Sequence, residues 1–339
     1  MMDYETFKGI VLNEFKNYLS DDLRDREFTI HKVNKVNQIM DGMTIGSPKN
    51  GNGEKFAPTI YVNNMYEQYK ELEDLEQVLK HNAQAYERAL EQGVKYITMS
   101  EDLLHKKDKI VFELINAEQN EELLRGIPYR PFYDLAVIYR VVIEVGEQNI
   151  ASAIVTNDMA MEMGLTEEEL FRHAAENTRS LFPVEIKPIS QIMREILERQ
   201  GMEEGMIECL IPEPSEREMM YVISNNMGIN GAAAMLYEKE LGELADKIDS
   251  DLIILPSSVH EVIAVPDLGG DPLEMADMVR EVNQMAVRLE ERLSNQVYKY
   301  DRQERKLSKI SGIPEVSIAE GESVPTKKAE TIGAGQPKR

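Results

Sequence analysis

The sequence is poor in cysteine and in aromatic residues. Its 339 residues contain one cysteine, Cys209, and no tryptophan. A single cysteine cannot form a disulfide within the chain, and it rules out the cysteine-rich kind of zinc site. Aromatic residues make up 6% of the chain, so the core must consist mainly of leucine, isoleucine, valine and methionine. Core filling is the expected role of the 19 methionines, although methionine-rich surfaces also bind partners.

Long apolar runs and positive charge are also lacking. No run approaches the roughly 18 apolar residues of a membrane span, and residues 1–15 carry charges where a signal peptide would be apolar. The 38 basic residues against 61 acidic ones give a net charge of −23, which disfavours binding to nucleic-acid backbones and anionic membranes. We therefore expect a cytoplasmic protein without either partner. Its acidic surface could maintain solubility, dock on a basic protein or mimic DNA. The oligomeric state stays open.

The hydrophobic pattern predicts an α+β fold with mixed or antiparallel strands and packed helices. Three hairpin-then-helix units begin their helices near Asn64, Thr166 and Pro272. A degenerate repeat could explain them, but ordinary α+β architecture is favoured. We expect helices over 3–20, 64–91, 166–180, 189–200, 238–248 and 272–289. We expect strands within 28–45, 59–62, 109–115, 134–145, 149–156, 219–225, 231–237, 251–265 and 294–302.

Several local signals fix the ends of these elements. Thr166 followed by Glu169 predicts a capping box, and Leu165 with Leu170 predicts a hydrophobic staple. Asp271 before Pro272 predicts another helix start. The dipeptide at 41–42, Asp-Gly, predicts the turn of the hairpin over 28–45. The expected loops cover 47–58 and 201–218.

Three regions are expected along the chain. Residues 1–105 form an N-terminal helix, hairpin and long-helix lobe, and residues 106–312 form a second α+β lobe packed on it. Residues 313–339, rich in proline, glycine, serine and charge, form a disordered tail.

The segment 251–265, DLIILPSSVHEVIAV, is the richest in chemistry. Ser257, Ser258, His260 and Glu261 offer the hydroxyl, imidazole and carboxylate types of a hydrolase or transferase. If 258–265 is extended, His260 and Glu261 point to opposite faces, and Ser258 lies about 6 to 7 Å from His260. The other interpretation is a structural turn whose serines bond to the backbone. These four residues are the catalytic candidates.

The segment 225–231, NNMGING, is a second candidate. Gly228 and Gly231 after a strand could form a phosphate turn, but they lack the lysine and hydroxyl of a P-loop. A turn that connects the strand to the next element is favoured, aided by Asn225, Asn226 and Asn230, which are retained as candidate binding residues. None of the five histidines lies in a metal-binding spacing, so neither a metal nor a cofactor is expected.

Several segments together resemble a family. VNKVNQIMDGMTI, TNDMAMEMGLTEEELFRHAAENT, ISNNMGINGAAAMLY and LPSSVHEVIAVPD resemble an uncharacterised domain-of-unknown-function family of Gram-positive bacteria over roughly residues 5–305. Residues 135–301 are also distantly similar to a second uncharacterised bacterial family. The resemblance implies an intracellular bacterial protein and brings no activity. Because the sequence contains no convincing catalytic or cofactor motif, we expect a non-enzymatic interaction protein that uses its acidic surface or a groove between units.

Overall fold

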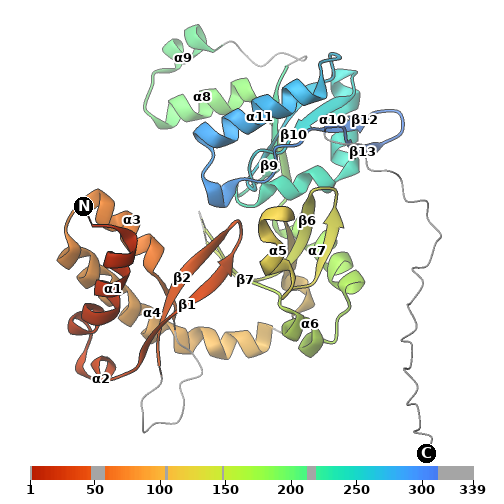
Figure 1. The fold of residues 1–339 in the computed structure, drawn as a ribbon. Helices are drawn as coiled ribbons and strands as arrows, with labels where there is room; N and C mark the ends of the chain where they lie inside the picture. The colour runs from red at the N-terminus through yellow and green to blue at the C-terminus, as the bar shows by residue number, and fades with distance from the viewer. Residues whose placement is uncertain (1, 47–57, 104–105, 147–148, 212–218, 312–339) are drawn as a thin grey trace, which may run out of the picture.

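The computed structural model describes residues 2–46, 58–103, 106–146, 149–211 and 219–311. The described strands form three antiparallel sheets with helices around them (Figure 1), which confirms the predicted α+β class. Most of the loop expected over 47–58 and all of the tail expected over 313–339 lie outside the described residues.

The N-terminal region packs helices against a small sheet with the order β1-β2-β3. Its core joins Phe7, Phe15, Met43, Met65 and Tyr86, all of them buried. The predicted opening helix is confirmed, because a 3-10 turn, η1, directly continues α1. The elements are α1 (Tyr4–Glu14), η1 (Phe15–Tyr18), α2 (Asp21–Arg24), β1 (Phe28–Lys35), β2 (Gln38–Ile45), β3 (Ile60–Tyr61), α3 (Val62–Leu72) and α4 (Leu75–Leu103).

The predicted turn at 41–42 is wrong, because the β1–β2 hairpin turns at Val36 and Asn37. Asn37 has a φ of 61°, a left-handed conformation that asparagine tolerates well. Asp41 is instead buried within β2 and forms an ion pair with Lys32 at 2.8 Å. A side chain at Gly42 would lie 2.6 Å from Val33 Cγ2, so this glycine serves close packing.

The single helix expected over 64–91 is two helices. Glu73 takes a left-handed φ of 53° after α3, and Asp74 begins α4 by accepting a hydrogen bond from the Gln77 amide at 3.0 Å. The left-handed residue Glu73 therefore ends α3, and the Asp74 cap starts α4.

The central region is a sheet in which β6 pairs with β4 on one side and with β5 and β7 on the other. The predicted capping box at Thr166 and Glu169 is confirmed at the start of α7. Pro131 lies in β5, an edge strand, where proline is tolerated. The elements are η2 (Lys107–Lys109), β4 (Ile110–Asn116), η3 (Glu118–Asn120), α5 (Glu121–Leu124), β5 (Tyr129–Phe132), β6 (Leu135–Val145), β7 (Ile150–Ile154), α6 (Asn157–Met163) and α7 (Glu167–Leu181).

The C-terminal region is a sheet of six strands in the order β13-β12-β10-β11-β9-β8. The strand expected over 231–237 is wrong: these residues form a buried 3-10 helix, η4, in which glycine and alanines pack closely. The loop expected over 201–218 contains a helix, α9. The elements are β8 (Val184–Pro188), α8 (Ile189–Arg199), α9 (Glu204–Leu210), β9 (Tyr221–Asn225), η4 (Gly231–Leu236), α10 (Glu238–Ile248), β10 (Leu252–Leu255), β11 (Val262–Pro266), α11 (Pro272–Ala286), η5 (Leu289–Glu291), β12 (Tyr298–Asp301) and β13 (Lys306–Lys309).

Candidate functional site

The Pro-Ser-Ser-Val-His-Glu loop, residues 256–261, connects β10 to β11. Residues 258–261 are not part of the strand, because β11 begins at Val262, so the geometry considered for an extended 258–265 segment does not apply. Ser258 Oγ accepts a hydrogen bond from the His260 amide at 3.1 Å, and Ser258 forms an isolated bridge with Arg292. These contacts make Ser258 part of a local turn.

His260 is oriented by groups other than the serines. Its Nδ1 accepts a hydrogen bond from the Asn230 amide at 3.2 Å, so the proton of the neutral ring lies on Nε2. Nε2 is 3.6 Å from Glu291 Oε1, which takes the place that the sequence offered to Glu261. Among the described residues, neither Ser257 nor Ser258 is hydrogen-bonded to the imidazole. The arrangement therefore holds His260 in place without activating a hydroxyl.

Glu291 is held in its charged form. The Arg288 guanidinium hydrogen-bonds to the Glu291 carboxylate and holds its pKa below the usual range, although burial opposes this effect. His260 contributes in the same direction when it carries a charge.

The structure brings the two candidate segments together. The Ser224 hydroxyl donates to the His260 carbonyl at 2.8 Å. The Asn225 side chain closes its own turn, because Oδ1 accepts from the Met227 amide at 3.0 Å and Nδ2 donates to the Ile229 carbonyl at 2.8 Å. Asn226 is exposed, and its amide donates to the Pro183 carbonyl at 2.9 Å. The asparagine segment therefore supports the neighbouring loop.

Contacts that the sequence did not indicate join the tip of the β1–β2 hairpin to residues 289–292, which in turn bond to the 256–261 loop. Asn37 and Asn120 exchange two hydrogen bonds, each 2.7 Å long. Asn37 Nδ2 also donates to the carbonyl of Arg292 at 2.6 Å, and the Glu291 carbonyl accepts from the Val259 amide at 2.8 Å. We call the contacts of Asn37 with Asn120 and with residues 289–292 the hairpin clasp.

The clasp places the β1–β2 hairpin next to β7 (Figure 1). Val36 at the hairpin tip packs on an apolar cluster that includes Ile138 and Ile154. Beside this contact lies a cavity of about 670 Å³, here called the hairpin groove. It is lined by Asn34, Lys35, Val36, Gln38, Met40, Tyr61, Asn64, Arg140, Ser152, Ala153, Ile154 and Glu290.

The charged side chains in the hairpin groove differ in whether they form ion pairs with other described residues. Arg140 is 3.1 Å from the buried carboxylate of Glu113, and Glu290 is 3.8 Å from Arg288. Lys35 Nζ lies 4.8 Å from the centre of the Tyr61 ring, and no carboxylate of the described residues is within ion-pair distance of it. The groove therefore presents one positive charge that is available to a ligand.

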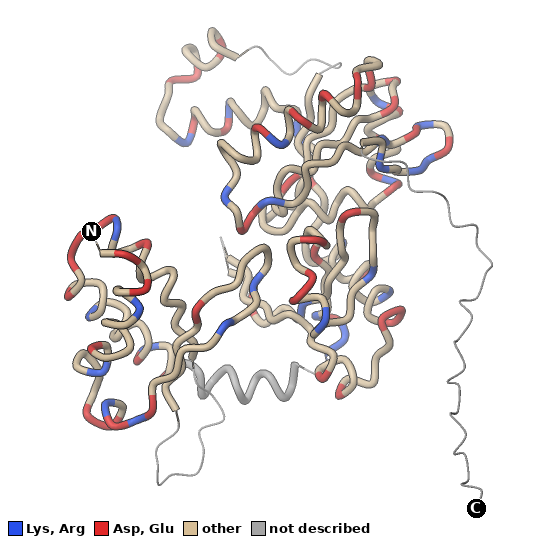
Figure 2. Tube along the Cα trace, viewed as in Figure 1, with Lys and Arg blue, Asp and Glu red and all other residues tan. Residues whose placement is uncertain are grey.

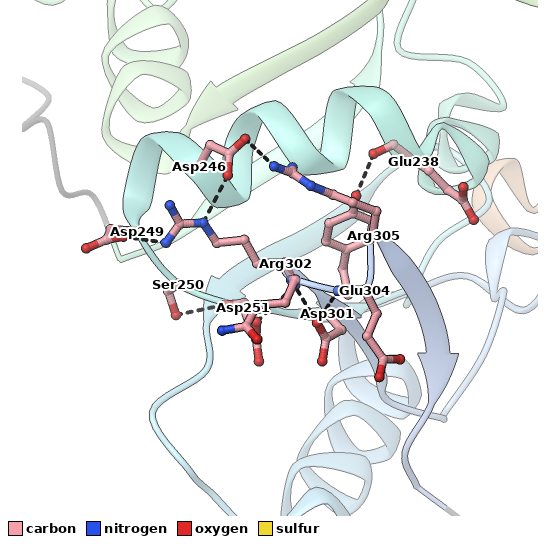
Figure 3. A network of polar contacts seen from close by, with 11 residues as sticks. Glu238, Asp246, Asp249, Ser250, Asp251, Asp301, Arg302, Glu304 and Arg305 are labelled. Atoms are coloured by element: carbon pink, nitrogen blue, oxygen red, sulfur yellow. Dashed lines mark hydrogen bonds and ion pairs between the residues drawn. The ribbon is translucent and has the colours of Figure 1, made fainter.

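A second cavity contains an ion-pair network near α10 (Figure 3). Asp246 binds Arg302 at 2.9 Å and Arg305 at 2.7 Å. Lys299 lies 2.8 Å from both Asp251 and Asp267. These ion pairs connect α10, the start of β10, the end of β11 and the β12–β13 hairpin, so the network stabilises the sheet end.

The ion pairs of Lys299 lead to a prediction for the stability of the folded protein in acid. The Lys299 hydrogen bonds lower the pKa of Asp251 and of Asp267, so their contribution is present above the unfolded pKa of about 3.9 and is lost as the pH falls through the folded values. Lys299→Met should lower the free energy of unfolding at pH 7 by roughly 1–2 kcal/mol and reduce the loss of stability between about pH 5 and pH 2. Urea unfolding at pH 7 and across the acidic range measures both effects.

Lys239→Met is the matched control, because Lys239 forms an exposed pair with Glu243 at 3.7 Å. It should change stability at pH 7 by less than about 0.5 kcal/mol. An acid profile for Lys299→Met that is parallel to the wild-type profile would refute the role given to the network.

Neither the distribution of charge along the chain nor the arrangement of potential metal ligands indicates a site among the described residues. Figure 2 shows acidic residues spread along the described chain with basic residues between them. No cluster of three or more potential metal ligands occurs among the described residues. None of the described helices combines the length and hydropathy of a membrane span.

Comparison with known proteins gives one result. The sequence model of a family described as "Family of unknown function (DUF5688)" matches residues 4–302. No curated protein and no solved structure matches the chain.

Proposed function

The chain belongs to the DUF5688 family, whose function is unknown, and we propose that it is a non-enzymatic protein that binds a protein partner in the hairpin groove. The proposal treats residues 1–105 and 106–312 as two packed lobes with the groove between them. A cytoplasmic location is part of it, since Cys209 has no cysteine in the chain to pair with.

The observation that carries the proposal is the Lys35 ammonium, which has no carboxylate partner among the described residues and lines a groove of about 670 Å³. In the groove, the described residues place the Tyr61 ring beside this ammonium group and no carboxylate within ion-pair distance of it. A lysine without one has its charge available for another molecule. The groove is also lined by Tyr61 and by polar residues such as Asn34 and Gln38, the mixture of aromatic and polar groups that ligand-binding surfaces use.

The alternatives have less support. A hydrolase or transferase at Ser257, Ser258, His260 and Glu261 needs a hydroxyl activated by the imidazole, whereas His260 bonds to Asn230 and faces Glu291. A DNA mimic needs carboxylates in rows spaced like phosphates, and the mixing of charges in Figure 2 does not favour such rows.

Charge reversal in the groove tests the proposal. Lys35→Glu should abolish capture of the partner from an extract of the native host at low salt, because the variant places a carboxylate where the partner's counter-charge lies. Quantitative mass spectrometry of the captured proteins provides the measurement.

Lys80→Glu is the control, because it makes the same charge change on the exposed surface of α4. Its captured proteins should match those of the wild type. A wild-type protein that captures no specific partner, or partners that are lost equally with both variants, would contradict the proposal.

A further inference from the structure

One wall of the hairpin groove is an open strand edge. The Val155 amide donates to the Tyr139 carbonyl at 2.8 Å, and the same register pairs Arg140 with Ile154. Hydrogen-bonded and non-hydrogen-bonded pairs alternate in an antiparallel ladder. The backbone groups of Ser152 and Ile154 therefore point away from β6.

These outward groups are largely unused. Among the described residues, no hydrogen bond involves the amide of Ser152, the amide of Ile154 or the carbonyl of Ile154. The Ser152 carbonyl accepts a long hydrogen bond of 3.3 Å from Arg140. Within the described part of the chain, β7 pairs with β6 alone, so its outer edge can accept another strand.

The opposite wall supplies a specific charge. Lys35 lies next to the hairpin turn opposite Gln38 and lines the same groove as Ser152 and Ile154. The neighbouring cation, Arg140, is engaged by Glu113 and Ser152. A single ammonium group selects a single carboxylate, and a run of acidic residues would be repelled by the net charge of −23.

We propose that an extended segment of the partner adds to the outer edge of β7 as a further strand and that one of its acidic side chains pairs with Lys35. This inference rests on the proposed function and gives it a binding mode. Main-chain hydrogen bonds to Ser152 and Ile154 provide sequence-tolerant affinity, and the Lys35 pair provides selectivity.

The first test is a displayed library of random peptides of about ten residues, selected on the purified full chain. Peptides selected by the wild type should carry aspartate or glutamate at one position, and peptides selected by Lys35→Glu should carry lysine or arginine there. A synthetic peptide of the selected sequence is then made with single ester bonds in place of amides. Esters at alternate positions should weaken binding about ten-fold, because only every second amide faces β7.

Two variants at one position examine the protein side. Ile154→Pro removes an outward N–H that the β6–β7 ladder does not use and should weaken peptide binding about ten-fold. Ile154→Ala keeps that N–H while losing the side chain, so it should bind peptide within about three-fold of the wild type. The ester series uses the wild-type protein and is therefore independent of how well the proline variant folds.

The outcomes separate the two proposals. A library that yields no binder overturns strand addition, and the Lys35→Glu capture experiment then decides the proposed function by itself. Peptides that depend on Lys35 but show no alternation in the ester series overturn strand addition and leave the groove as the binding site. Alternation together with loss of binding in Ile154→Pro supports strand addition.

Discussion

Replacing Asn37 with alanine should lower the free energy of unfolding by roughly 2–4 kcal/mol. Asn37 is 7% exposed, and its side chain joins the hairpin to Asn120 and to residues 289–292. Its loss would leave the buried Asn120 amide without one acceptor, which adds a desolvation cost to the lost bonds. Alanine also tolerates a φ of 61° poorly. Urea unfolding measures the change.

Two further variants separate these contributions. Asn37→Gly permits the left-handed backbone but lacks the side chain, so it should recover roughly 1 kcal/mol relative to Asn37→Ala. Asn13→Ala, on the exposed side of α1, should stay within about 0.5 kcal/mol of the wild type. If Asn37→Ala were as stable as Asn13→Ala, the clasp would not hold the hairpin in place.

Replacing Gly231 with alanine should destabilise the chain by roughly 1–3 kcal/mol or prevent it from folding. A side chain there would lie 2.2 Å from Ser224 Oγ, 2.6 Å from the His260 carbonyl and 2.7 Å from the Asn225 amide nitrogen. Two of these atoms belong to the backbone and cannot rotate away. The two candidate segments must therefore separate to admit a methyl group. The midpoint of thermal unfolding measures the effect.

Gly9→Ala is the control, and we expect it to change the stability in the opposite direction. Gly9 lies in α1, and a methyl group added there would meet no atom of a neighbouring described residue within 4 Å, so alanine should stabilise the helix by about 0.5–1 kcal/mol. A Gly231→Ala protein with unchanged stability would show that the two loops are not closely packed.

Local signals in the sequence predicted the elements whose formation depends on near neighbours. Thr166 and Glu169 cap α7 because both partners lie within one helical turn. Asp271 and Pro272 start α11 for the same reason. The strands predicted over 134–145 and 149–156 are β6 and β7, and their apolar runs and short connection explain why they pair as a hairpin.

The predictions from the sequence were wrong where tertiary contacts decide which structure a segment adopts. Asp41 and Gly42 have the composition of a turn, yet Asp41 pairs with Lys32 within the sheet and Gly42 faces Val33. Glu73 breaks the long helix, and the Asp74 cap was the available signal for it. The alanines of η4 gave no periodicity that separates a strand from a tight helix.

The candidate site shows the same limit. The segments around Asn225 and His260 were chosen for their chemistry, and the structure joins them through contacts 30 and 36 residues apart. We did not predict the groove residues Lys35, Arg140 and Ile154. Their proximity depends on the docking of Asn37 on residues 289–292, which lie about 250 positions away in the sequence. No local pattern encodes that contact.

Lysine labelling in the presence of a host extract tests the central claim most directly. The protein is acetylated with an isotope-coded reagent with and without extract, and the modification of each lysine is measured by mass spectrometry. If the hairpin groove is the binding site, labelling of Lys35 falls several-fold in the extract while labelling of Lys80 stays constant. Equal labelling of Lys35 in both conditions, with protection at lysines elsewhere, would place the partner on another surface and contradict the account.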